Sequence, residues 1–94
     1  MRDYELKIML DYISSGSTDN FEMATEAGNV INIISVLGND KNIESYEFTV
    51  SNSKHPSIVT TDSLEMPEDG FLQGSGEIVD LINKLLEEAE ELVS

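Results

Sequence analysis

The sequence contains no cysteine and a single histidine among its 94 residues. Without cysteine the chain can form no disulfide, no thiolate nucleophile and no cysteine-ligated metal site, which suits a reducing compartment. The one histidine, His55, precedes a proline in a segment expected to be a loop, whereas a catalytic triad needs a base that is held in position. We therefore expect a protein that is not an enzyme and that carries no cofactor and no metal.

Long apolar runs are also missing. No stretch approaches the ~20 apolar residues of a membrane-spanning helix, and residues 1–5 do not begin an apolar signal segment. The predicted location is the cytoplasm. A chain of 94 residues holds one modest core and no repeat divides it, so we expect a single domain over residues 1–94.

Basic residues are scarce: the chain has 5 Lys and Arg against 19 Asp and Glu, a net charge of -14. Such a surface repels nucleic acid and anionic membranes, and it attracts basic partners at long range. We therefore expect no direct binding to nucleic acid or membrane. The predicted partner is a basic protein, in particular one that itself binds nucleic acid. The alternative is that the charge serves only solubility.

The first 24 residues are predicted to form a β-hairpin. Apolar and polar side chains alternate over residues 4–13, with the period of a half-buried strand. A helix is the alternative, because four of the apolar residues also fit one helix face: Leu6, Met9, Leu10 and Ile13. A turn-forming cluster follows, and a short alternation resumes within residues 19–24, which favours the hairpin.

The middle of the chain is predicted to be a helix followed by two strands. Thr25 can cap a helix, and apolar residues recur at helical spacing as far as Gly38, a residue that can end it. Residues 43–50 then alternate as a strand does, and residues 57–61 are expected to form a fourth strand. Proline and glycine make residues 65–76 a predicted loop.

The clearest local pattern is a helix from about residue 76 to Val93. Its apolar residues fill one arc of about 160°, and its polar residues lie outside that arc. Four glutamates in its last two turns oppose the helix dipole, which prefers cations there. The resulting order is ββαββα. It predicts an α+β fold, an antiparallel sheet with two helices on one face.

Acidic residues are concentrated in the C-terminal third of the chain. Residues 62–94 hold ten of them and one base, Lys84, a net charge of -9 out of -14. Carboxylates on one helix face recur about every 5–6 Å, a spacing comparable to that of phosphates along a DNA strand. We predict that these ten residues form the partner-binding surface: Asp62, Glu65, Glu68, Asp69, Glu77, Asp80, Glu87, Glu88, Glu90 and Glu91.

Small size, concentrated acidity and the lack of catalytic residues together resemble the small acidic inhibitors of phages, the DNA mimics and many anti-CRISPR proteins. The resemblance lies in size and charge, and it assigns no individual residue. It implies an inhibitor that binds another protein and evades host defence, in the cytoplasm of the host cell if the protein is phage-encoded. Such an inhibitor occupies a basic surface of a nuclease or CRISPR effector and blocks access of DNA or RNA.

Two alternatives remain at this point. One is an immunity or antitoxin-like protein, or an oligomeric accessory protein; the wide apolar arc of the last helix allows a homodimer. The other follows from the tripeptide at residues 62–64, Asp-Ser-Leu, which resembles the attachment site of acyl carrier proteins and implies a phosphopantetheine arm on Ser63. In that family a long helix begins at the serine, whereas here Pro67 and Gly70 would interrupt such a helix.

Overall fold

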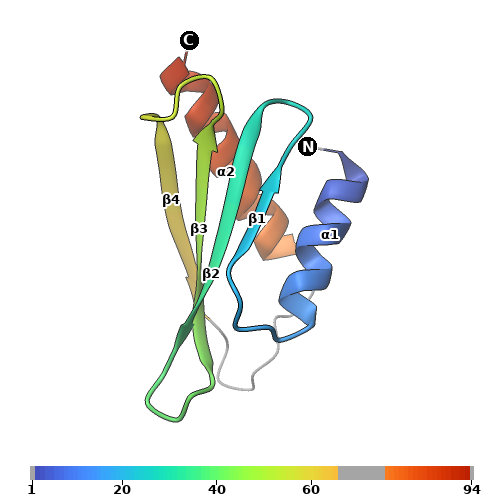
Figure 1. The fold of residues 1–94 in the computed structure, drawn as a ribbon, viewed down its shortest axis with the longest axis vertical. Coiled ribbons are helices and arrows are strands. Elements are labelled where there is room, and N and C mark those ends of the chain that lie inside the picture. The colour runs from blue at the N-terminus through green and yellow to red at the C-terminus, as the bar shows by residue number, and fades with distance from the viewer. Residues whose placement is uncertain (1, 66–75, 94) are drawn as a thin grey trace.

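In a computed structural model that describes residues 2–65 and 76–93, the chain forms an α+β fold with one four-stranded antiparallel sheet (Figure 1). The α+β class and the antiparallel sheet confirm the prediction, but the element order is αββββα rather than ββαββα. In chain order the elements are α1 (Asp3–Ser14), β1 (Phe21–Ala24), β2 (Asn29–Leu37), β3 (Ile43–Asn52), β4 (Val59–Glu65) and α2 (Gly76–Val93).

The sheet is a meander in which each strand pairs with the next, in the order β1-β2-β3-β4. The register places Ile33 opposite Phe48 and Ile31 opposite Val50, and all four side chains are fully buried on one face. Tyr46 is buried on the same face of β3, so the alternation predicted for residues 43–50 is confirmed. The core lies against this face of the sheet.

α2 covers the buried face, where it contacts β3 and β4 (Figure 1). Its buried residues are the centre of the predicted apolar arc, so both the helix and its inward face are confirmed: Ile78, Ile82, Leu85 and Ala89. A polar contact adds to the packing, because the Thr60 hydroxyl of β4 donates to the Leu85 carbonyl of α2 at 3.0 Å. The orientation of α2 on the sheet is therefore fixed by packing and by a buried hydrogen bond.

α1 lies beside β1, at the end of the sheet opposite β4 (Figure 1). It closes the core from there with Met9 and Ile13, both buried, and the Tyr46 hydroxyl reaches the Ile13 carbonyl at 3.5 Å. The predicted layout of two helices on one face is therefore not what the structure has. α2 covers the face of β3 and β4, whereas α1 flanks the sheet.

The predicted hairpin of residues 4–13 and 19–24 is wrong, and the helical alternative for the first segment is correct. Both patterns fit the sequence, but the helix buries Met9 and Ile13 on one side and also buries Glu5. The Glu5 carboxylate accepts the Arg2 backbone N–H at 2.8 Å, which satisfies one of the free donors at the start of the helix. Residues 21–24 do form a strand, β1, but it pairs with β2.

The predicted helix from Thr25 to Gly38 is also wrong, because most of this segment is β2. The strand is rich in β-branched residues, which prefer extended backbone: Val30, Ile31, Ile33, Ile34 and Val36. Thr25 belongs to a tight turn instead of capping a helix. Its N–H donates to the Asn29 carbonyl at 2.8 Å, and Gly28 supplies the positive φ of 90° within the turn.

The fourth strand lies further along the chain than predicted, at Val59–Glu65 instead of residues 57–61. Asp62 and Glu65 consequently belong to a strand and not to an acidic loop. The alternation of this strand extends through Leu64, whose side chain is half-buried against the core. Of the loop predicted for residues 65–76, positions 66–75 lie outside the described residues.

Candidate functional site

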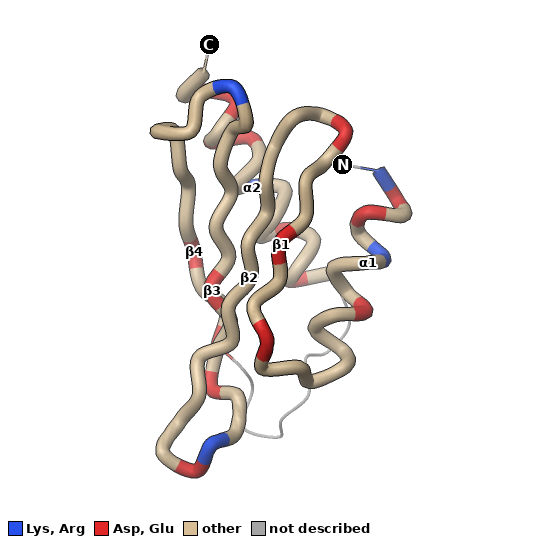
Figure 2. The backbone as a smooth tube through the Cα atoms, in the orientation of Figure 1, with Lys and Arg blue, Asp and Glu red and all other residues tan. Residues whose placement is uncertain are grey.

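The structure distributes the predicted acidic surface over two elements. Asp62 and Glu65 lie on β4, and Glu68 and Asp69 lie outside the described residues. The other six residues all belong to α2: Glu77, Asp80, Glu87, Glu88, Glu90 and Glu91. Figure 2 shows that acidic residues also occur on α1 and along the sheet, while the few Lys and Arg are scattered. The excess of negative charge therefore extends over the molecule, with its densest run on α2.

The acidic residues of α2 face two different neighbours. Glu87 and Glu90 lie on the side next to the turn between β1 and β2, where they line a groove. Glu88 lies near Lys84, whose side chain reaches Asp62 on β4. The described acidic residues therefore do not form one continuous surface. Glu87 and Glu90 lie beside the groove, whereas the β4 side of the helix contains the ion pair between Lys84 and Asp62.

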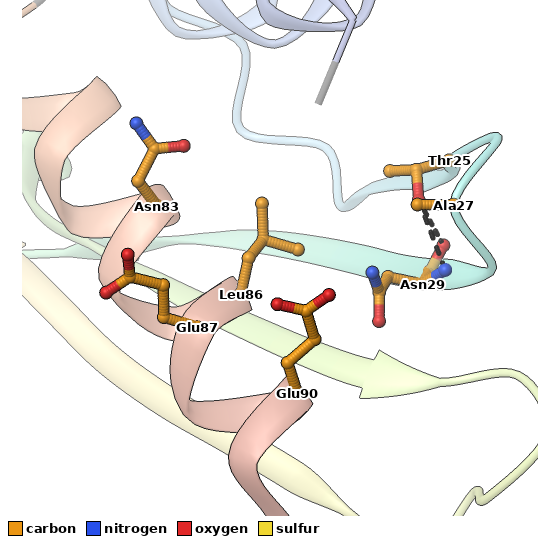
Figure 3. Close-up of a pocket in the computed structure, with 7 residues that line it drawn as sticks. All are labelled: Thr25, Ala27, Asn29, Asn83, Leu86, Glu87 and Glu90. Atoms are coloured by element: carbon orange, nitrogen blue, oxygen red, sulfur yellow. Dashed lines mark hydrogen bonds between the residues drawn. The ribbon is translucent and has the colours of Figure 1, made fainter. Parts of the chain in front are cut away.

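The groove between α2 and the β1–β2 turn has a volume of about 290 Å³. In Figure 3 the helix side chains lie on one side, the turn residues lie on the other, and Leu86 projects between them. The lining residues are Thr25, Ala27, Asn29, Asn83, Leu86, Glu87 and Glu90. Thr25 and Asn29 are bonded to each other, since the Asn29 N–H donates to the Thr25 hydroxyl oxygen at 3.1 Å. This hydrogen bond helps to fix the conformation of the turn that forms one side of the groove.

The chemistry of this groove suits a cation. Glu87 and Glu90 supply carboxylate oxygens, Asn29 and Asn83 supply amide oxygens, and Leu86 offers an apolar surface. A lysine or arginine side chain has this combination of an apolar stem and a charged head that donates several hydrogen bonds. Among the described residues no group of three or more His, Cys, Asp and Glu side chains is placed to hold a metal ion.

Asp62 is held in place by two hydrogen bonds. Its Oδ1 accepts the Ser63 backbone N–H at 2.8 Å, and its Oδ2 accepts Lys84 Nζ at 3.1 Å. The Ser63 N–H, followed by Lys84, lowers the pKa of the Asp62 carboxyl, and the same hydrogen bond from Lys84 to Asp62 raises the pKa of Lys84. Asp62 therefore carries a stabilised negative charge beside the stabilised positive charge of Lys84.

Glu5 and Glu26 form a second carboxylate cluster, which was not predicted from the sequence. Glu5 is buried, and its Oε2 accepts the Glu26 backbone N–H at 3.0 Å while its Oε1 accepts that of Arg2. The Glu26 carboxylate accepts Arg2 Nε at 2.8 Å and the Tyr4 hydroxyl at 2.9 Å. The cluster joins the start of α1 to the β1–β2 turn. The sequence signal for the Glu5 contact was the spacing of a capping box, in which the third residue of the helix is a glutamate that bonds back to the residue before the helix, here Arg2.

The two residues discussed for chemistry lie in ordinary surroundings. Ser63 is an exposed residue within β4 and does not begin a helix. His55 is exposed in the turn between β3 and β4, where its backbone N–H donates to the Asn52 side chain at 3.0 Å. Neither helix of the described chain combines the length and the apolar character needed to cross a membrane.

Comparison of the chain with protein-family models, with curated proteins and with solved structures gave no significant match. The functional assignment therefore depends on the residues themselves. The features that can support one are the acidic side of α2, the groove that it shares with the β1–β2 turn, and the edge strand β4, which pairs with β3 alone among the described strands.

Proposed function

We propose that the protein is a non-enzymatic inhibitor that binds a basic surface of another protein, the surface with which that protein holds DNA or RNA. The observation that carries the proposal is on α2. Six carboxylates lie outside its buried stripe, and its one base, Lys84, is bonded to Asp62. The helix thus presents a row of six carboxylates against one base on a rigid element.

A groove lined by Lys and Arg that normally holds nucleic acid would accept such a helix. An 18-residue helix is about 27 Å long, and its carboxylates lie on a rigid backbone packed against the sheet. Duplex DNA offers a comparable dense array of negative charge. In this proposal the protein is of the DNA-mimic or anti-CRISPR type and acts by blocking access of nucleic acid to a nuclease or effector.

The test compares two variants of equal net charge. In the first, Glu87, Glu88, Glu90 and Glu91 become Gln; in the second, four exposed acidic residues elsewhere become their amides: Asp11, Asp19, Glu44 and Glu47. Each protein is immobilised and used to capture proteins from a bacterial lysate with and without duplex DNA, and any captured nuclease is assayed for inhibition. The salt dependence of capture is measured in parallel.

We expect the native protein and the second variant to capture a nucleic-acid-binding enzyme and to inhibit it, and DNA and salt to weaken that capture. The first variant should lose at least tenfold in affinity. Equal capture by both variants would show that total charge, and not the α2 surface, is recognised. Capture that DNA does not compete would contradict the proposed site on the partner.

An immunity-like or oligomeric accessory protein is the second candidate, and one observation favours it. Leu92 at the end of α2 is 62% exposed, and Leu37 and Val59 on the strands are about half exposed. These side chains could be covered by another protein or by a second copy. Light scattering at rising protein concentration distinguishes the two, because only self-association produces a dimer of the purified chain.

A carrier function at Ser63 has less support, because this serine lies in the middle of the strand β4. In the carrier family the attachment serine begins a helix. Mass spectrometry of the protein from cells that contain a phosphopantetheinyl transferase tests this reading directly. We expect no mass increment on Ser63.

A further inference from the structure

β4 forms one edge of the sheet, and it pairs with β3 alone among the elements of the described chain (Figure 1). The edge is seven residues long, Val59–Glu65. The opposite edge, β1, has only four residues and lies beside α1 (Figure 1). A strand edge carries backbone donors and acceptors that another extended chain can pair with. β4 is therefore the longer of the two edges that strand addition could use.

The register shows which backbone groups of β4 point away from the sheet. The Asn52 N–H donates to the Ile58 carbonyl at 3.4 Å, so this pair is hydrogen-bonded. Hydrogen-bonded and non-hydrogen-bonded pairs alternate in an antiparallel ladder, and the β3–β4 register has no bulge. Residues 60, 62 and 64 consequently bond to β3. The N–H and C=O groups of four residues face outward: Val59, Thr61, Ser63 and Glu65.

One of these outward donors is already occupied. The Ser63 N–H donates to Asp62 Oδ1 at 2.8 Å, and Lys84 holds the other carboxylate oxygen at 3.1 Å. A chain that adds to β4 must take over this N–H, and the Asp62 carboxylate must then find another donor. The hydrogen bonds of Asp62 thus decide which chains can pair with the edge.

We propose that the β4 edge binds an extended, basic segment of the partner by strand addition, and that Asp62 selects such a segment over a second copy of this chain. The inference rests on the proposed function, since it takes the partner to be basic. In the complex, the Ser63 N–H bonds to a carbonyl of the added strand. The Asp62 carboxylate pairs with a Lys or Arg side chain of that strand.

Charge complementarity decides between the two occupants. Two copies paired antiparallel about the centre of β4 place Asp62 directly opposite Asp62 of the other copy, with Cα atoms about 4.5 Å apart in a non-hydrogen-bonded pair. Like charges so placed are destabilising, and each copy also has a net charge of -14. A basic strand instead brings a cation to Asp62, on the face of β4 from which Lys84 reaches it. The edge therefore favours a cationic strand.

The test uses the full chain, labelled with ¹⁵N, and a nine-residue synthetic peptide in which Lys alternates with Thr and Val. A peptide with Glu in place of Lys is the control. Amide hydrogen exchange is measured by NMR with and without each peptide. We expect the basic peptide to slow exchange at Val59, Thr61, Ser63 and Glu65 at least fivefold, and the acidic peptide to leave it unchanged.

Two variants make the test specific to the edge. Ser63→Pro removes an N–H that is not bonded to β3, so the fold should persist while the protection is lost. Asp62→Asn keeps an acceptor for the Ser63 N–H but removes the charge, and it should weaken binding of the basic peptide at least threefold. This second variant keeps the proposal testable even if the proline variant does not fold.

Three outcomes would overturn the proposal, and they differ in what else they affect. Peptide-induced changes confined to α2 would reject the edge while leaving the proposed function intact. Protection of β4 that rises with protein concentration in the absence of peptide would identify a second copy as the occupant. No interaction with the basic peptide anywhere on the protein would count against both the edge and the proposed function.

Discussion

The two helices, at the two ends of the chain, use the same side chain for opposite purposes. At the start of α1 the carboxylate of Glu5 is buried, and it accepts two backbone N–H groups from different parts of the chain. In the last turns of α2 the carboxylates of Glu87 and Glu90 are exposed beside a groove. Glu5 holds elements of the fold together, whereas the glutamates of α2 contribute charge to the surface.

The difference shows that a count of acidic residues does not describe a surface. Glu5 and Glu26 lie in the N-terminal part of the chain and are engaged with Arg2, Tyr4 and backbone donors. Buried charge is costly unless hydrogen bonds replace water, and Glu5 has these bonds. A glutamate without such partners is best accommodated in solvent, where its charge is available to another molecule.

The largest effect that should follow from this comparison is on stability, in Glu5→Leu. The substitution leaves the partly buried Arg2 and Glu26 N–H groups without their acceptor and removes the capping interaction at the start of α1; an unsatisfied donor costs up to about 1–3 kcal/mol when it is fully buried. We expect the free energy of unfolding, measured with urea, to fall by about 2–4 kcal/mol. The matched control is Glu87→Ala on α2, which should change it by less than about 0.5 kcal/mol. Equal losses in the two variants would mean that Glu5 has no special structural role.

The fold was predictable where one pattern alone fitted the sequence. α2 has a single apolar arc and β3 a single alternation, and both were predicted with nearly correct bounds. Over residues 4–13 two patterns fitted, and tertiary burial of Met9 and Ile13 decided for the helix. Over residues 29–37 apolar residues are so frequent that helical spacing was met by chance. The β-branched side chains there were the better guide.

The site was predictable as a set of charges but not as an arrangement. The sequence places six acidic residues on the last helix, and that assignment is confirmed. It does not indicate that Glu87 and Glu90 face the β1–β2 turn, because that turn was expected to be the start of a helix. Nor does it indicate that Lys84 reaches Asp62, 22 positions earlier in the chain. Both contacts depend on strand order and register.

A smaller effect, of opposite sign, is expected for the charge of α2. Changing Glu87, Glu88, Glu90 and Glu91 to Gln removes repulsion between like charges and an unfavourable interaction with the helix dipole. We expect the free energy of unfolding at low salt to rise by about 0.5–1.5 kcal/mol. The gain should shrink as salt is added, because exposed charges are screened. The measurement is urea unfolding at two salt concentrations.

The matched control for α2 is the variant with amides at Asp11, Asp19, Glu44 and Glu47, which has the same net charge. It should be stabilised less, because only Asp11 lies in the last turn of a helix, whereas Asp19 lies in a loop and Glu44 and Glu47 on β3. If both variants gain equally, the effect comes from net charge alone. The position of the carboxylates on α2 would then have no effect on the free energy of unfolding beyond that of their charge.

The smallest effect concerns Asp62, which is intermediate between Glu5 and the glutamates of α2 because its carboxylate is partly exposed and also hydrogen-bonded. Its pKa is lowered in the folded protein, so its stabilising contribution is present above the unfolded pKa of about 3.9 and is lost as pH falls through the lower folded value. The melting temperature of the native protein should therefore exceed that of Asp62→Asn near neutral pH, and the difference should vanish in acid.

In Lys84→Met, a ¹³C NMR titration of the Asp62 carboxyl should show a pKa only part of the way back to its ordinary value, because the Ser63 N–H is the larger cause of the shift. Complete recovery in that variant would instead assign the shift to the ion pair.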